Sequence, residues 1–246
     1  MLPLGDENIP GRGPAFVTLI VIAINVLVFV LLQLPNDAFT YAWAAVPAEI
    51  TSGEDITGSR NVPGGSITLG ESPEPVYLTL ISSMFMHGGW LHLGGNMLFL
   101  WIFGDNVEHA MGHLPFVLFY LGAGVLASLA HVWVEPDSLI PLVGASGAIS
   151  GVLGAYLVMF PANRVLVVAF YFVLWVPAVL VIGLWAVLQF INGFGQIALT
   201  EQTAGVAYLA HIGGFLAGVA AGLVLRAAGR VPSRGALQRA AQRGWR

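Results

Sequence analysis

Runs of about 20 consecutive apolar residues dominate this sequence, and they constrain its fold more than any other feature. A membrane-spanning α-helix needs about 20 apolar residues to cross the hydrocarbon core of a bilayer. The 246-residue chain is 57% hydrophobic and only 9% charged, whereas roughly a quarter of the residues in an ordinary soluble domain are charged. The sequence therefore predicts an all-α membrane protein.

The apolar runs predict six transmembrane helices. The fourth is short for a span, so we expect residues 138–145 to fold inward ahead of it, enclosed by protein or lining water. Pro177 is expected to kink the fifth. The predicted spans are Pro14–Leu34, Leu91–Met111, Leu114–Val134, Ser146–Phe160, Val165–Ile191 and Ala204–Ala228.

Three parts make up the predicted chain: a cytoplasmic N-terminal segment (1–13), a six-helix membrane domain (14–228) and a basic cytoplasmic tail (229–246). The first loop, Pro35–Pro75, is long, acidic and rich in glycine. Loops of this length inside compact domains are usually functional or disordered. We expect short interfacial helices close to it, at Ala38–Val46 and Tyr77–Met86.

The arginines predict the orientation of the chain in the membrane. All nine basic residues are arginine, and six of them follow Leu225. Six spans place both termini on one side, and the positive-inside rule makes that side the cytoplasm. Arg12 and Arg164 fall on the same side, and only Arg60 lies outside. We therefore predict a multi-pass protein of the cell inner (plasma) membrane, with the first loop extracytoplasmic.

Composition also excludes several classes of function. The chain has no cysteine, so it contains neither disulfides nor thiolate metal sites. Its net charge is −4 and no basic surface is interleaved with aromatic residues, so nucleic-acid binding has no support. Met1–Pro14 lacks the features of a removable signal peptide. No cofactor is implied.

Two polar side chains in separate glycine-rich apolar runs form the candidate catalytic pair. Ser146 begins the fourth predicted span and His211 lies in the outer half of the sixth. A serine becomes a nucleophile when a base removes its proton, and small residues around both side chains allow close approach of the helices. Gly147 and Gly214 are among these small residues.

Donors for an oxyanion are also present. Ser146 at a helix start offers its own backbone N–H. His92 and Asn96 lie four residues apart and therefore share one helix face. The spans near His211 contain no aspartate or glutamate to orient the imidazole, so we expect a dyad rather than a triad.

These residues resemble the signature of the rhomboid intramembrane serine proteases. The matching pieces are Gly144-Ala-Ser146-Gly147, Ala210-His211-Ile-Gly-Gly214, His87-x4-His92-x3-Asn96 and Gly104-Asp-Asn106. The order of the helices and the long first loop match as well. The resemblance extends over about residues 77–225 and implies a bacterial-type rhomboid bundle of six transmembrane helices.

The resemblance implies a serine endopeptidase, a hydrolase that cuts within or beside the membrane. Ser146 would be the nucleophile and His211 the general base and acid. His92, Asn96 and the Ser146 amide would form the oxyanion hole, with the Gly144 backbone as a further candidate. Substrates would be single-span membrane proteins embedded in the lipid bilayer.

Two positions depart from the family pattern. The Trp-Arg pair that many members have in the first loop is absent. Ser150 stands where many members have a tyrosine stacked on the histidine. His87, at the edge of the loop, is expected to order the loop or the start of the second helix rather than take part in the chemistry.

Other functions remain possible on the residues alone. A non-catalytic rhomboid-like protein that binds membrane helices is the main alternative to the protease. A transporter would be expected to show inverted repeats, and none is found. His87, His92 and His211 could ligate zinc, although the His-Glu-x-x-His motif typical of metalloproteases is absent.

Overall fold

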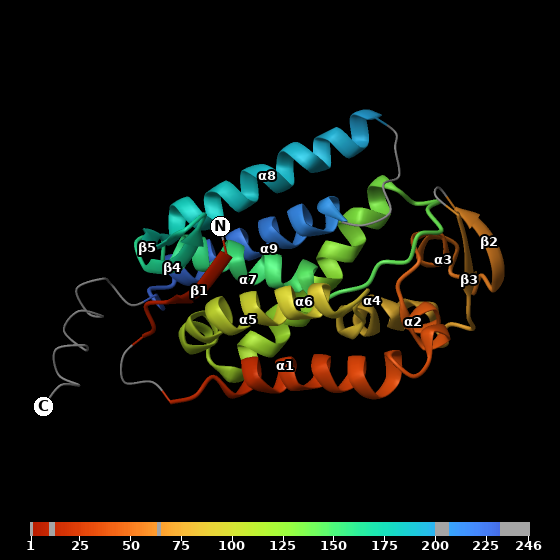
Figure 1. Ribbon diagram of the computed structural model, residues 1–246, viewed down its shortest axis with the longest axis horizontal. Helices are drawn as coiled ribbons and strands as arrows, with labels where there is room; N and C mark the ends of the chain where they lie inside the picture. The colour runs from red at the N-terminus through yellow and green to blue at the C-terminus, as the bar shows by residue number, and fades with distance from the viewer. Residues whose placement is uncertain (1, 10–12, 63–64, 200–206, 232–246) are drawn as a thin grey trace, which may run out of the picture.

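The computed structural model describes residues 2–9, 13–62, 65–199 and 207–231. Long helices lie side by side and make up most of this part of the chain (Figure 1). They are α1 (Phe16–Val28), continued by the π-helical turn η1 (Phe29–Gln33), α5 (Trp90–Met111), α6 (His113–Val134), α7 (Ser146–Met159), α8 (Ala178–Leu199) and α9 (Tyr208–Ala227).

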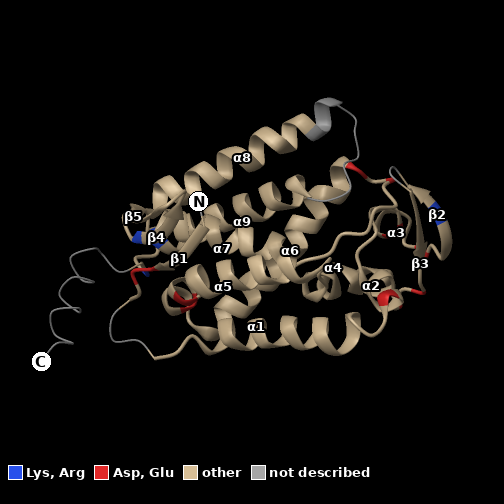
Figure 2. Ribbon diagram, in the orientation of Figure 1, with Lys and Arg blue, Asp and Glu red and all other residues tan. Residues whose placement is uncertain are grey.

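Four of the helices in the described residues are long and apolar enough to cross a membrane. These segments are Phe16–Gln33, His113–Val134, Ala178–Gly195 and Tyr208–Ala227. Among the described residues, the charged ones lie towards the two ends of the bundle and not in its middle (Figure 2). This distribution is typical of a protein whose middle part lies in the hydrocarbon core of a bilayer, because placing a charged side chain there costs free energy. The chain is therefore a multi-pass membrane protein.

The predicted helices agree with the observed ones at four of six places. α1 with η1, α5, α6 and α7 coincide with the first four predicted spans to within two residues at each end. The sixth, predicted over Ala204–Ala228, corresponds to α9, and residues 204–206 lie outside the described residues. The 14 residues of α7 span only about 21 Å, so it is as short as expected.

The predicted fifth span, Val165–Ile191 with a kink at Pro177, is wrong in its first half. Residues 164–177 form two antiparallel strands, β4 (Arg164–Ala169) and β5 (Phe172–Pro177), and α8 begins only after Pro177. Most residues of this run are β-branched or aromatic, and such residues favour strands. Pro177 therefore ends a strand instead of kinking a longer helix.

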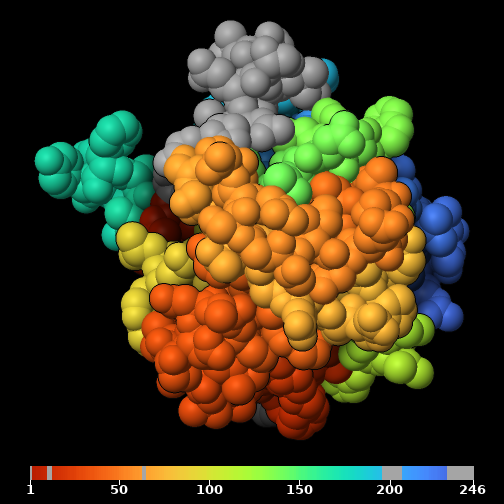
Figure 3. Space-filling model, turned by 90° about the vertical axis from the view of Figure 1, so that its right-hand side faces the viewer, coloured from red at the N-terminus to blue at the C-terminus, as the bar shows by residue number. Residues whose placement is uncertain are grey.

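The N-terminal residues complete this sheet, which the sequence did not predict. β1 (Leu2–Asp6) pairs antiparallel with β4, with Leu2 opposite Val168, and the strand order is β1-β4-β5. At the tip of the β4–β5 hairpin, Phe170 and Tyr171 are 94% and 97% exposed. The hairpin protrudes from the side of the molecule, in teal in Figure 3.

Asp6 fastens β1 to the helices. Its Oδ2 accepts hydrogen bonds from the Tyr156 hydroxyl on α7 and from Asn106 Nδ2 on α5, the latter at 2.8 Å. Burial, reinforced by the nearby charge of Asp105, raises the pKa of the Asp6 carboxyl from 3.8 to about 7. The folded protein therefore holds a proton on Asp6 at pH values where the unfolded chain has released it.

We expect the stability of the protein to fall as pH rises from about 4 to about 7 through the Asp6 carboxyl. The folded pKa is raised, so folding takes up a proton in this window and loses that advantage as pH rises. Thermal unfolding at pH 5 and pH 8 measures this effect, with Asp6→Asn as the non-titrating control. The wild type should lose more of its Tm between these pH values than Asp6→Asn. An equal loss in both proteins would contradict the prediction.

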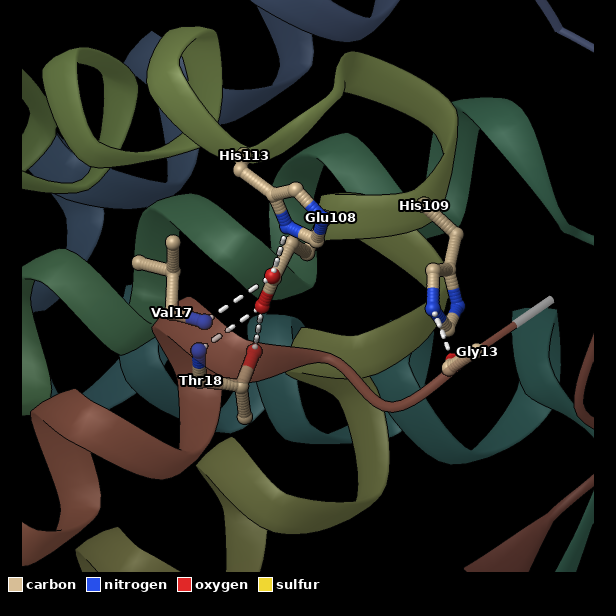
Figure 4. A network of polar contacts seen from close by, with 6 residues as sticks. All are labelled: Gly13, Val17, Thr18, Glu108, His109 and His113. Carbon is tan, nitrogen blue, oxygen red and sulfur yellow. Dashed lines mark hydrogen bonds and ion pairs between the residues drawn. The ribbon is translucent and has the colours of Figure 1, made fainter.

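Glu108 joins α1 to α5 near the same end of the bundle (Figure 4). The side chain is fully buried and accepts hydrogen bonds from the backbone N–H groups of Val17 and Thr18 at 3.0 and 2.7 Å and from the Thr18 hydroxyl at 2.7 Å. His113 Nδ1 lies 2.5 Å from Glu108 Oε1, the oxygen that also accepts from Val17. The first N–H groups of a helix have no hydrogen-bond partner within the helix. The Glu108 carboxylate supplies acceptors for two of these groups and thereby anchors the start of α1 to α5.

The first loop is an ordered cap over the opposite end of the bundle, in orange in Figure 3. Short helices occur at the two places where they were predicted, Ala38–Val46 and Tyr77–Met86, and their interfacial position stays a prediction. The β-hairpin between them was not predicted. The elements of this region are α2 (Asp37–Trp43), α3 (Pro47–Ser52), β2 (Gly58–Val62), β3 (Gly65–Leu69), η2 (Val76–Leu78), α4 (Thr79–Ser82) and η3 (Ser83–Phe85).

Glu49 on α3 helps to hold this cap together. It is 1% exposed, and it accepts hydrogen bonds from the Ile56 backbone and the Ser72 hydroxyl, each at 3.1 Å. Burial raises the pKa of this carboxyl. The loop is thus ordered by its own polar contacts.

Candidate active site

Direct backbone contact between α7 and α9 sets the geometry of the site. A Cβ atom at Gly214 would lie 2.0 Å from the Gly147 carbonyl oxygen, and one at Gly218 would lie 1.9 Å from the Gly151 carbonyl oxygen. No side chain larger than hydrogen fits at either position. Glycine therefore allows the two helices to approach until their backbones touch.

This contact brings Ser146 and His211 together. Ser146 is the first residue of α7, and its Oγ lies 2.8 Å from His211 Nε2 on α9. The distance is that of a good hydrogen bond. A hydroxyl and an imidazole in this contact can exchange a proton, which is the first requirement of nucleophilic catalysis by serine.

His92 and Asn96 project from α5 towards the start of α7. A Cβ atom at Gly144 would lie 2.8 Å from the His92 ring and 3.6 Å from Asn96 Nδ2. Gly144 has a φ of +121°, a conformation that side chains disfavour. Glycine at this position therefore permits the positive φ of the turn, and it leaves room for the side chains of His92 and Asn96.

Hydrogen bonding leaves both α5 side chains with a donor to offer. The Gly88 N–H donates to His92 Nδ1 at 3.2 Å, so a neutral His92 ring carries its proton on Nε2. Asn96 is 8% exposed, and its Nδ2 has no hydrogen-bond partner within the described part of the chain. Buried amide groups nearly always have partners, so this one marks a place for a ligand.

The Gly144 backbone was a further candidate donor. Its N–H donates instead to the Ser83 carbonyl at 2.9 Å. That bond holds the chain entering α7, and we assign no other partner to this N–H.

A cavity of about 560 Å³ joins these groups. Its lining includes Ser146, His211, His92 and Asn96, together with Trp185 from α8. A volume of this size lies within the range of ordinary ligand sites. Polar groups in an otherwise apolar wall can orient a peptide bond there.

His87 lies behind His92 rather than against Ser146. The two imidazole rings are 5.2 Å apart in a T-shaped arrangement. The Gln33 side chain binds the His87 backbone on both sides, accepting from its N–H at 2.9 Å and donating to its carbonyl at 3.1 Å. The histidines form no cluster suited to a metal ion in the residues that the structure describes.

Two residues at the site escaped the sequence analysis, and both come from α8. Gln189 Oε1 lies 2.8 Å from His211 Nδ1. The Trp185 ring lies 6.2 Å from the His211 ring at an interplanar angle of 36°. Ser150 donates its hydroxyl to the Ser146 carbonyl at 2.7 Å. For Trp185 and Gln189, the only signal in the sequence was their spacing of four residues within an apolar run.

Comparisons with known proteins agree on one family. Residues 74–228, more than half of the chain, match the model of the Rhomboid domain. The chain is 29% identical over 202 residues to "Rhomboid protein 1, mitochondrial" of Saccharomyces cerevisiae, which covers 80% of this chain and 50% of that protein. It is 32% identical over 153 residues to "Rhomboid protease GluP" of Bacillus subtilis, covering 62% and 26% respectively. The chain thus spans half or less of the length of these relatives.

Proposed function

Because this chain belongs to the rhomboid family, we propose that it is an intramembrane serine endopeptidase in which Ser146 and His211 form the catalytic dyad. The 2.8 Å contact between Ser146 Oγ and His211 Nε2 is the observation that carries the proposal. The donors around the cavity support it, because a protein that merely binds helices needs none of them.

The proposed reaction starts with proton transfer from Ser146 to His211. As His211 Nε2 takes the proton, Ser146 Oγ bonds to the substrate carbonyl carbon, and the carbonyl electrons move onto oxygen. The imidazolium then gives its proton to the leaving amine as the C–N bond breaks. Water attacks the resulting ester with His211 again as base, which releases the acid and restores Ser146.

The charge that develops on the substrate oxygen needs preorganised donors. We assign this role to the Ser146 backbone N–H, His92 Nε2–H and Asn96 Nδ2–H. The first belongs to the start of α7, where helical N–H groups lack internal partners. The second is a donor because Gly88 occupies Nδ1, and the third has no partner in the described residues.

We also propose that six helices span the membrane, with both termini in the cytoplasm. α5 and the short α7 would join the four apolar spans. Arg164 begins β4, which pairs with β1, and Arg226 donates a hydrogen bond to the Val158 carbonyl near the end of α7. The first loop lies at the other end of the bundle (Figure 1). The positive-inside rule then places the first loop outside an inner (plasma) membrane. Arg234, Arg239, Arg243 and Arg246 lie outside the described residues.

The proposed substrates are membrane proteins with one span. Helical carbonyls are hydrogen-bonded, so a substrate helix must unwind before Ser146 can attack. The site lies in the outer half of the bundle in the proposed topology, so the cut would fall near the outer end of the substrate helix. Water for hydrolysis would reach it through the 560 Å³ cavity.

A fluorophosphonate probe tests this function. We expect it to modify the purified protein at one position, with the adduct mapped to Ser146 by mass spectrometry, because only an activated serine reacts readily. The same preparation in lipid vesicles should cleave a single-span reporter. Absence of any adduct in a protein that still binds the reporter would favour the non-catalytic alternative. An adduct on another serine would mean that this other serine, and not Ser146, is the nucleophile.

A further inference from the structure

The imidazole of His211 is held between two side chains, one on each ring nitrogen. Ser146 Oγ lies 2.8 Å from Nε2, and Gln189 Oε1 on α8 lies 2.8 Å from Nδ1. We propose that Gln189 is the positioning residue of the dyad and fills the place of the carboxylate in a serine protease triad. This inference rests on the proposed function and deepens it.

The contact selects the productive tautomer of His211. A neutral imidazole carries one N–H, and only the other nitrogen can accept a proton. The Gln189 carbonyl oxygen can only accept, so the ring proton resides on Nδ1 and the lone pair of Nε2 faces Ser146. After proton transfer from Ser146, the ring is an imidazolium. Its Nδ1–H bond to Gln189 then becomes charge-assisted and stronger.

The packing of α8 against α9 fixes the direction of Gln189. Trp185, Gln189 and Gly193 are spaced by four residues and share one face of α8. Trp185 packs beside the His211 ring, and a Cβ atom at Gly193 would lie 2.7 Å from Ile212 Cδ1. The helix is therefore close to α9 on either side of Gln189, and the amide is aimed at Nδ1.

An amide suits this depth better than a carboxylate. Charged side chains inside a bilayer are costly unless paired, and His211 is neutral for most of the catalytic cycle. Gln189 supplies the acceptor without a permanent charge. The exposed residues of α8 nearest Gln189 are Val187, Leu188, Ile191 and Asn192, and none of them carries a charge.

Substitutions at Gln189 separate hydrogen bonding from packing. Gln189→Leu keeps most of the volume and removes the acceptor, whereas Gln189→Glu keeps an oxygen that can only accept. Val187→Ala, at a 53% exposed position of α8, is the matched control. The readout is the rate of fluorophosphonate labelling between pH 5 and pH 9, with thermal stability recorded for each variant.

We expect Gln189→Leu to label about 10- to 100-fold more slowly, by analogy with the loss that follows removal of the outer partner of a metal-bound histidine. Gln189→Glu should label at close to the wild-type rate at high pH. Its acidic limb should move to higher pH, because a carboxylate stabilises the imidazolium. The other titratable groups near His211 are His92 on α5, His131 on α6 and Tyr208 on α9, and every variant retains all three. Val187→Ala should match the wild type.

The outcomes distinguish the two proposals. An unlabelled wild type would reject the protease itself. A labelled wild type with Gln189→Leu at the same rate would reject the role of Gln189. If Gln189→Leu loses thermal stability, the decision rests on Gln189→Glu. A Gln189→Glu pH profile identical to that of the wild type would overturn the positioning role. Labelling of Gln189→Glu as slow as that of Gln189→Leu at every pH would overturn it as well.

Discussion

Replacing His211 with alanine is expected to lower the rate of reporter cleavage by about 10⁴-fold or more, which in practice means to the background of the assay. Nε2 of this residue is the only base in contact with Ser146 Oγ among the described residues. Without it the hydroxyl keeps its proton and remains a weak nucleophile. The protein should still fold, because the α7–α9 contact rests on glycines rather than on the imidazole.

The comparison with Ser146→Ala makes this result specific. Residues that act as one catalytic unit have strongly non-additive effects, so Ser146→Ala, His211→Ala and the double variant should all be equally inactive. His109→Ala is the matched control, since His109 contacts the Gly13 carbonyl at the far end of the bundle and should leave cleavage unchanged. Cleavage by His211→Ala within tenfold of the wild type would mean that another group removes the serine proton.

The second large effect is expected at Gly218, where alanine should destabilise the bundle by about 3 kcal/mol or more. Its Cβ would lie 1.9 Å from the Gly151 carbonyl oxygen and 2.6 Å from the Gly151 carbonyl carbon. Both atoms belong to a helical backbone that cannot turn aside as a side chain can. α7 and α9 would separate, and the Ser146–His211 distance would grow with them.

Gly183→Ala provides the matched control for this prediction. Gly183 is also helical, on α8, but a Cβ there meets nothing within 4 Å, so alanine should leave stability unchanged or raise it slightly. Thermal unfolding in detergent, followed by tryptophan fluorescence, should show Gly218→Ala melting roughly 6–12 °C below Gly183→Ala. Equal melting temperatures would mean that the helices separate without cost, and the backbone contact would not be what holds the dyad together.

Several features of the fold could be predicted from local sequence alone. Length and hydropathy located α1 with η1, α5, α6 and α7 to within two residues at each end, because crossing a bilayer requires a minimum run of apolar residues. The motifs around Ser146 and His211, in their order along the chain, predicted the family, and the match to the Rhomboid domain confirms it. These motifs are short, and their meaning depends on residue identity more than on distant contacts.

The β-sheet could not be predicted in the same way. β1 and β4 lie far apart in the sequence, and Leu2 meets Val168 only because the bundle brings them together. The run from residue 165 to residue 177 is apolar throughout, and its composition satisfies either a strand or the start of a span. Pairing with β1 decides between them, and that pairing is a property of the whole fold.

The sequence by itself located α5, α6, α7 and α1 with η1, and it identified the two glycine-rich motifs that contain Ser146 and His211. The tertiary structure alone decided that Gln189 and Trp185 meet His211. In a soluble helix the apolar stripe reveals the buried face. In a bilayer, lipid and protein are both apolar, so the pattern along α8 does not indicate which face turns inward. Only the packing of α8 against α9 sets that rotation, and with it the environment of the imidazole.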